Sequence, residues 1–169
     1  MKALDIANAI IKIHGRDSYL TNMKLNKLVY FAYANALQAG ERLFDDDIEA
    51  WAFGPVVPNV YKEFANYGSG QIRFLPLGEV PQEALSVAED VWRNYGFMTA
   101  MDIMEFSHRS GGAWEKKYVS GQRHIRIDDS DIRQSSDGIE LPKFKGTFAD
   151  AMNKSSKRWA KVLDMLADS

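Results

Sequence analysis

The segment over residues 21–37 constrains the fold more than any other part of the chain. Its apolar side chains recur at helical spacing and extend around most of the helix: Leu25, Leu28, Val29, Tyr30, Phe31, Ala32, Tyr33 and Leu37. A surface helix carries one apolar stripe, whereas a helix that is apolar on most sides is buried. Thr21 is a favourable N-cap, and Gly40 marks the end of the segment. We therefore expect this helix at the centre of its domain.

The remaining pattern predicts a mainly α, compact single-domain helical bundle with minor short β segments. Apolar periodicity indicates further helices over residues 4–13, 58–67, 82–95, 99–107 and 147–166. The helix expected over residues 58–67 should open at Pro55 and Pro58, because proline is tolerated in a first helical turn. Residues 48–53 are the best strand candidate.

Shorter elements are expected in the less regular C-terminal third. Residues 125–127 and 139–142 are candidates for a short pair of extended segments, and residues 130–136 for a single helical turn. Trp114 is expected to begin a further turn after the break at residues 110–112.

Composition excludes several classes of function. The chain has 169 residues, of which 46% are hydrophobic and 26% charged, as in one globular domain. Its net charge of -2 argues against nucleic-acid binding, which depends on clustered Lys and Arg. The absence of cysteine excludes disulfides and thiolate chemistry. No targeting signal or run of about 18 apolar residues is present, so we expect a cytoplasmic protein without a membrane span.

No catalytic or metal-binding constellation is recognisable. His14, His108 and His124 do not follow a metal-ligand spacing. Ser107 and His108 are adjacent, and consecutive helical residues point about 100° apart. Residues 68–70 lack the flanking pattern of a nucleophile elbow or a phosphate loop. We expect no catalytic residue, metal or cofactor; a hydrolase using Ser107, His108 or nearby carboxylates is the least favoured alternative.

Charged and aromatic residues suggest surfaces for a protein partner. Two lysines share a face of the central helix, three consecutive aspartates precede the strand candidate, and a tryptophan lies in the last helix. The aspartates lack the ligand alternation of a calcium loop, so a solvated turn or a charged docking edge is expected. The residues predicted to bind a partner are Lys24, Lys27, Asp45, Asp46, Asp47 and Trp159.

Two stretches resemble a known family. The first is LTNMKLNKLVYFA at residues 20–32, and the second is LFD at residues 43–45 followed by EAWAFGPVVPNVY at residues 49–61. In order and spacing they are similar to the Panacea antitoxin domain, the SocA-like, phage-associated family. A looser third element includes Ser107, His108 and Trp114, with Ala113 where the family often has proline. The resemblance covers about residues 3–118, and residues 119–169 are expected to be a family-variable extension ending in a helix packed on the same domain.

We interpret these motifs as a fold signature rather than a catalytic site, because no acid, base and nucleophile converge in them. Thr21 is expected to cap the central helix, whose leucines are buried. Gly54 and Pro55 are expected to force a turn, and Pro58 to restart a helix with Tyr61 pointing inward. The signature residues are Thr21, Leu25, Leu28, Tyr30, Trp51, Gly54, Pro55, Pro58 and Tyr61.

The resemblance implies a binding function without chemistry of its own. Members of the family act as antitoxins that neutralise a cognate protein toxin by direct contact, and some deliver the toxin to a cytoplasmic protease as adaptors. No DNA-binding extension is recognisable, so nucleic acid is not an expected partner. The alternative is a phage or prophage protein that binds a host factor.

Overall fold

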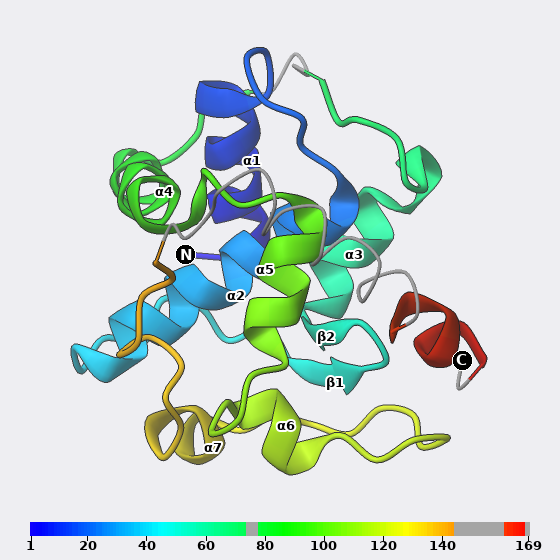
Figure 1. Ribbon diagram of the computed structural model, residues 1–169. Coiled ribbons are helices and arrows are strands. Elements are labelled where there is room, and N and C mark those ends of the chain that lie inside the picture. Colours follow the sequence, from blue (N-terminus) through cyan, green and yellow to red (C-terminus); the bar gives the residue numbers. More distant parts are fainter. Residues whose placement is uncertain (74–77, 144–160, 168–169) are drawn as a thin grey trace.

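Helix α2 (Asn22–Gln38) lies at the centre of the computed structural model, which describes residues 1–73, 78–143 and 161–167 (Figure 1). Thirteen of its seventeen residues are buried, including four polar or charged ones. The side chain of Thr21 accepts a hydrogen bond from the backbone N–H of Lys24 at 3.2 Å and caps the helix. The predicted central helix and its cap are therefore confirmed.

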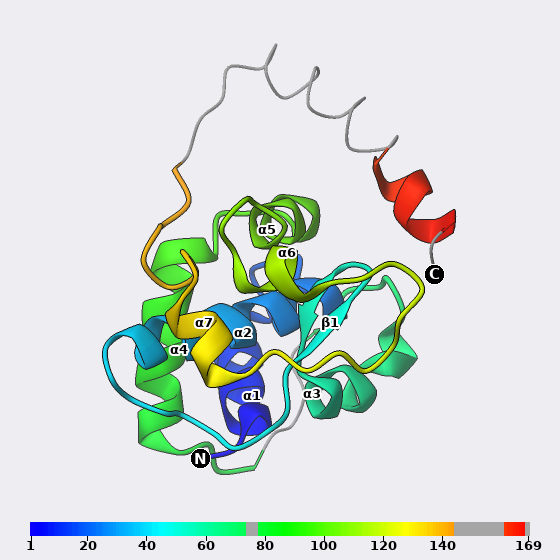
Figure 2. The ribbon, with the colours of Figure 1, turned by 90° about the horizontal axis from the view of Figure 1, so that it is seen from below.

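Helices pack around α2 on several sides, and the protein is mainly α-helical as expected (Figures 1 and 2). Helix α1 (Ala3–His14) packs against α4 (Gln82–Tyr95), and both contact α2. Helix α5 (Ala100–Ser107) contacts α2 separately. Between α1 and α4 the rings of His14 and Trp92 stack with their centres 4.0 Å apart. Burial of these apolar faces is the main stabilising contribution.

The residues after the acidic turn form a β-hairpin. Strand β1 (Glu49–Trp51) pairs antiparallel with β2 (Gly54–Val56), with Ala50 opposite Pro55. The strand expected at 48–53 is confirmed, but the helix does not open at Pro55, because that residue lies in β2. Proline is compatible with a strand on a sheet edge. Helix α3 (Pro58–Glu63) begins at the next proline, and the 3₁₀ turn η1 (Ala65–Tyr67) follows it.

Gly54 is required at the hairpin turn for two reasons. Its φ of 104° is strained for any residue with a side chain. A Cβ there would also lie 2.5 Å from Ser107 Oγ and 2.7 Å from Lys27 Cε. The side chains of α2 and α5 thus occupy the space that a larger residue would need.

The C-terminal third contains α6 (Ala113–Lys117) and α7 (Asp129–Arg133), which confirm the turns expected at residues 114 and 130–136. Residues 125–127 run along β1, with the N–H of Ala50 donating to the carbonyl of Ile125 at 2.8 Å. Residues 139–142 do not pair with them, because the N–H of Ile139 turns back to Ser136. Residues 161–167 are helical, as expected for the last helix; the rest of that prediction, including Trp159, lies outside the described residues.

A buried carboxylate that the sequence analysis did not single out joins this C-terminal part to the core. Asp137 is fully buried, and its Oδ2 accepts hydrogen bonds from the hydroxyl of Tyr30 at 2.6 Å and the N–H of Ala113 at 2.9 Å. Its Oδ1 pairs with Arg109 at 2.9 Å. Burial and the neighbouring carboxylate raise the pKa of Tyr30 well above its ordinary value, so the phenol remains a donor. One side chain thereby connects α2, the end of α5 and α6.

We expect Asp137→Ala to lower the free energy of unfolding by about 3–5 kcal/mol, because it removes the carboxylate paired with the largely buried Arg109 and leaves two buried donors, the Tyr30 hydroxyl and the Ala113 N–H, without their acceptor. Urea unfolding followed by circular dichroism measures the change. Asp45→Ala is the control, since the Asp45 side chain is 92% exposed and should change stability by less than about 0.5 kcal/mol. Similar losses for both variants would contradict this role of Asp137.

Candidate functional site

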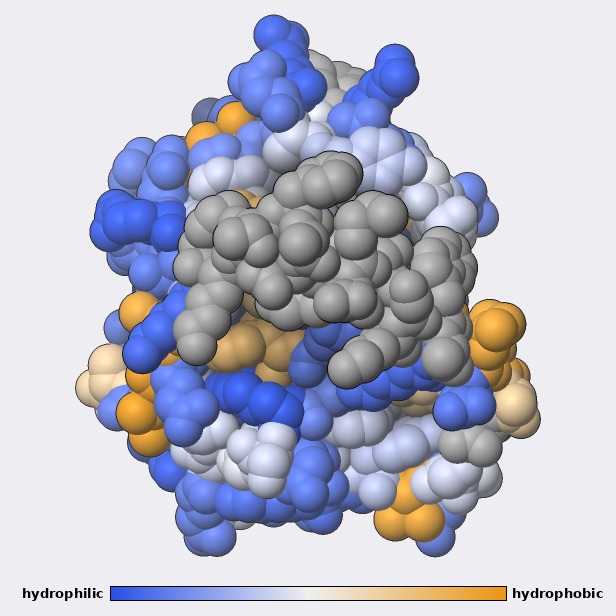
Figure 3. All heavy atoms as spheres, in the orientation of Figure 1, coloured by the Kyte–Doolittle hydropathy of each residue, from blue (hydrophilic) through white to orange (hydrophobic). Residues whose placement is uncertain are grey.

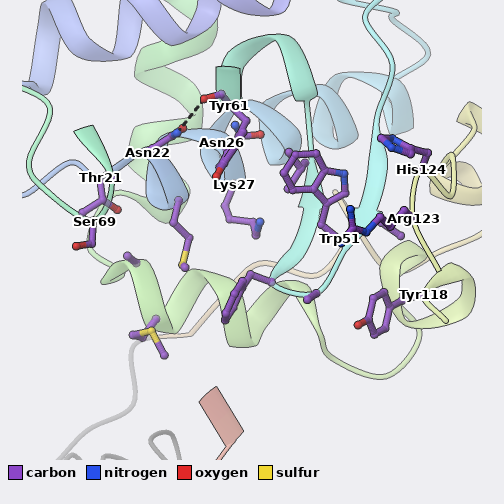
Figure 4. A pocket seen from close by; sticks show the side chains of 18 of the residues that line it. Thr21, Asn22, Asn26, Lys27, Trp51, Tyr61, Ser69, Tyr118, Arg123 and His124 are labelled. Atoms are coloured by element: carbon purple, nitrogen blue, oxygen red, sulfur yellow. Dashed lines mark hydrogen bonds between the residues drawn. The ribbon is translucent and has the colours of Figure 1, made fainter. Parts of the chain in front are cut away.

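A groove of about 790 Å³ lies beside the N-terminal half of α2 (Figure 4). The hairpin, α3, the start of α5 and the loop over residues 118–124 supply its other walls. Its lining is largely apolar, with a few polar side chains from α2 and basic ones from the loop. A concave, mostly apolar site with a few convergent polar groups is typical of a binding site.

Two aromatic residues form one wall of the groove. The rings of Trp51 and Tyr61 meet edge to face with their centres 4.9 Å apart. Trp51 Nε1 donates to Glu49 Oε2 at 2.7 Å, and its carbonyl accepts a hydrogen bond from Trp114 Nε1 at 2.7 Å. These bonds fix the indole of Trp51 while leaving it only half-buried.

The expectation that Tyr61 points inward is wrong. Its side chain is 41% exposed, whereas Val60 and Phe64 on the same segment are buried. Consecutive helical residues point about 100° apart, so a short helix that buries Val60 turns Tyr61 toward the groove. The tyrosine of the predicted fold signature is therefore a lining residue of the site.

Three polar side chains of α2 hold the opposite wall together. Asn22 Nδ2 donates to the carbonyl of Tyr61 at 3.0 Å, and Asn26 Oδ1 accepts from the N–H of Val57 at 2.8 Å. Lys27 Nζ donates to the carbonyl of Pro55 at 2.9 Å. Each bond satisfies a backbone group of β2, α3 or the residues between them, so α2 determines where these elements lie.

The two lysines of α2 that are predicted to bind a partner are both buried in the folded protein. Lys24 is 5% exposed and Lys27 is 1% exposed, because α4, α5 and the hairpin cover this side of the helix. Lys24 Nζ donates to the carbonyl of Gly96 at 2.8 Å and lies 4.8 Å from the centre of the Trp92 ring. Gly96 is the C-cap of α4, where a positive charge is favourable. Lys24 thus caps a neighbouring helix, and only Lys27 lines the groove.

Burial disfavours the charged form of Lys27 relative to a lysine in water. Burial lowers its pKa to about 7, and no carboxylate lies within ion-pair distance of it in the part of the chain that the structure describes. The nearby His108 stacks on Trp114 with ring centres 3.6 Å apart. Burial, followed by the charges of Lys27 and Lys161, lowers the pKa of His108 to about 3, so its imidazole is neutral at pH 7.

Ser107 and His108 do not form a nucleophile–base pair. Ser107 Oγ donates to the carbonyl of Met104 at 2.6 Å, as a hydroxyl does when it is satisfied by its own helix. Among the described residues, no group of three or more His, Cys, Asp or Glu side chains is placed to hold a metal ion. None of the described helices is long and apolar enough to cross a membrane. The hydrolase alternative gains no geometric support from this arrangement.

The three consecutive aspartates have different surroundings. Asp46 accepts hydrogen bonds from the N–H of Ala3, at the start of α1, and from Asn59 Nδ2, at 3.0 and 2.8 Å. The exposed Asp45 and Asp47 pair with arginine side chains at 3.1 Å each. Asp46 therefore caps α1, and a role in partner binding for Asp45, Asp46 and Asp47 stays a prediction.

The sequence analysis missed the loop that closes the groove. Tyr118, Arg123 and His124 line it, although they are far from α2 in sequence. His124 has a φ of 58° and lies 3.2 Å from Glu49 Oε2, which ties the loop to β1. Residues 119–146 show weak periodicity, so only the tertiary structure places these side chains.

On the face drawn in Figure 3, the described surface is mostly hydrophilic, with hydrophobic residues in small separate groups.

The described residues form a helical domain with a largely apolar groove at the N-terminal half of its central helix. The sequence matches the family described as Antitoxin SocA-like, Panacea domain, over residues 25–115. The chain therefore belongs to this antitoxin family, which confirms the resemblance seen in the motifs. No solved structure matches it significantly.

A curated relative supports the same assignment. Antitoxin SocA of Caulobacter vibrioides (strain NA1000 / CB15N) is 32% identical over 125 residues. The match covers 65% of this chain and 66% of the relative, so the chain spans just under two thirds of that protein. The matched family segment includes α2 from Leu25, the hairpin, α3, α4 and α5, and hence most of the groove.

Lys24→Glu tests the capping role of Lys24. We expect it to lower the free energy of unfolding by about 3 kcal/mol or more, because it places a carboxylate against the carbonyl end of α4. Lys24→Met, which keeps the aliphatic stem, should cost only about 1 kcal/mol. Thermal and urea unfolding of both variants measure the difference. Unchanged stability of Lys24→Glu would show that this side of α2 is solvated in solution.

Lys27→Met tests the buried ammonium. The pKa of Lys27 is lower in the folded state, so the unfolded state binds more protons above pH 7 and folding stability rises with pH. The methionine variant lacks this dependence and should be more stable than the native protein near pH 6. We expect the advantage to shrink between about pH 7 and 9.5, by at most about 1.4 kcal/mol per pH unit. Urea unfolding across this range measures it, and a constant difference would contradict the lowered pKa.

Proposed function

We propose that this protein is the antitoxin of a toxin–antitoxin pair and neutralises its cognate toxin by direct protein contact. Membership of the antitoxin family, together with a groove bounded by α2 and the hairpin, carries this proposal. The expected compartment is the cytoplasm, and no nucleic acid or membrane partner is required.

The groove supplies the features of a protein-binding hot spot. Tryptophan and tyrosine contribute most to binding energy when they lie in a partly enclosed, pre-organised site. Trp51 and Tyr61 meet this description, since hydrogen bonds and an edge-to-face contact fix their positions before a partner binds. A pre-formed site reduces the entropy that association costs. We propose that a segment of the toxin inserts between this aromatic wall and α2.

Delivery of the toxin to a cytoplasmic protease extends the same proposal. It requires a second surface outside the groove, and we propose the exposed Asp45 and Asp47 at the acidic turn for it. Purified protease degrading the toxin faster when this protein is present would support an adaptor role. Equal rates would restrict the function to sequestration.

Co-expression with the product of the adjacent gene tests the antitoxin function. We expect that gene alone to inhibit growth, the pair to restore growth, and the two proteins to elute together at a fixed stoichiometry. A neighbour that is harmless alone and does not co-elute would favour the alternative, a phage or prophage protein that binds a host factor. Pull-down from the host would then identify the partner.

Trp51→Ala should weaken toxin binding by about 2 kcal/mol or more, roughly 30-fold in Kd, because it removes the larger ring of the aromatic wall. Titration calorimetry with the purified toxin measures the loss, and thermal unfolding shows whether the variant stays folded. Tyr19→Ala is the matched control, since Tyr19 is 67% exposed and does not line the groove. Equal effects of both substitutions would exclude this wall as the contact surface.

A further inference from the structure

We propose that the α2 side of the groove is a carboxylate receptor, in which Lys27 and Asn26 bind an acidic group of an inserted peptide segment. This inference rests on the proposed function, because it names the chemistry of the toxin segment that enters the groove. The shared ligand is a carboxylate, supplied by an Asp or Glu side chain or by the C-terminus of the partner.

The first observation is the incomplete coordination of Lys27. An ammonium group has three N–H donors, and the carbonyl of Pro55 accepts one of them. Ser107 Oγ is close to the lysine stem but donates its proton to Met104. The cation is thus buried at the groove with no anion beside it among the residues described. Such a group gains most from an incoming carboxylate, because the pairing takes place away from bulk water.

The second observation is a pair of buried amide atoms on the same helix. Asn26 uses its Oδ1 for Val57, while its buried Nδ2 has no hydrogen-bond partner within the described chain. Asn22 uses its Nδ2 for Tyr61, while its buried Oδ1 has none. Buried polar groups are nearly always hydrogen-bonded. Both asparagines line the groove, one turn of α2 apart, so a bound peptide can supply the missing N–H and carbonyl or carboxylate groups (Figure 4).

The third observation is the sign of the charges around the groove. Lys27 and Arg123 line it, and no described lining residue is an Asp or Glu, although the chain carries a net charge of -2. Glu49 is not a lining residue, and its carboxylate is occupied by Trp51 Nε1 at 2.7 Å and by His124 at 3.2 Å. Charge complementarity therefore favours an acidic segment over a basic one. The apolar side chains of the groove, such as Trp51 and Met101, favour hydrophobic residues next to the acidic group.

Binding should depend on pH with a defined sign. The groups that face Lys27 or lie close to it are the carbonyl of Pro55 on β2, Ser107 at the end of α5 and His108 after it. Lys161 lies near His108, and Arg123 and His124 line the same groove. His108 is neutral over the range of interest. A carboxylate partner favours the protonated amine, so binding takes up a proton above pH 7 and weakens as the pH rises.

Selection of random displayed peptides on the purified protein tests the receptor without the toxin. We expect the wild-type protein to enrich acidic peptides with apolar neighbours, and Lys27→Met to lose the acidic preference. Lys12→Met is the control, because Lys12 is exposed and lies outside the groove. A selection that enriches no peptide, or only neutral or basic ones, overturns the proposal.

Synthetic versions of an enriched peptide distinguish the source of the carboxylate. Replacing Asp or Glu with its amide should weaken binding about tenfold or more to the wild-type protein and less than about twofold to Lys27→Met. If amidation of the C-terminus causes the loss instead, the terminal carboxylate is the ligand. Affinity of the acidic peptide should fall severalfold between about pH 6.5 and 8.5 for the wild type alone. Equal losses in both proteins, or displacement by inorganic phosphate but not by acetate, would overturn the carboxylate assignment.

Thermal unfolding of Lys27→Met and Lys27→Gln is measured first, to establish whether each variant is folded before its binding is interpreted. The outcome is independent of the co-expression experiment. Growth rescue without acidic selectivity would leave the antitoxin function in place and remove the receptor. Acidic selectivity without a toxic neighbour would keep the receptor and assign its ligand to a host factor.

Discussion

The burial of α2 on most sides is the constraint on which the rest of the structure depends. Helices from both halves of the chain pack against its apolar residues. Its polar residues are buried by this packing and therefore need hydrogen-bond partners inside the protein. Lys24 caps α4, Tyr30 donates to Asp137, and Asn26 binds the backbone after β2. Each of these contacts places a different surrounding element, so the polar groups of α2 determine the arrangement that its apolar groups stabilise.

The groove follows from the same contacts. Asn22, Asn26 and Lys27 use part of their hydrogen-bonding capacity to hold α3 and the hairpin, and all three residues line the groove. The residues that build the fold are thus also the ones available to a ligand.

Much of the fold was predictable because it depends on local patterns. The long helix, the Thr21 cap, the strand at residue 49 and the turn near Asp129 follow from periodicity and capping, which act over a few residues. The family was also evident from two motifs of fixed order. Pro55 was assigned to a helix because proline suits both a first helical turn and an edge strand, and only the pairing with Ala50 distinguishes them.

The sequence by itself determined the family, the helical class and the central helix, since these depend on spacing along the chain. Only the tertiary structure decided which polar residues are buried. Lys24 and Lys27 share a helical face that resembles a solvated one until α4 and the hairpin cover it. The Asp137 network and the loop at His124 join residues more than 70 positions apart. No local pattern encodes such pairings, because their energy exists only once the distant partners meet in a water-excluded interior.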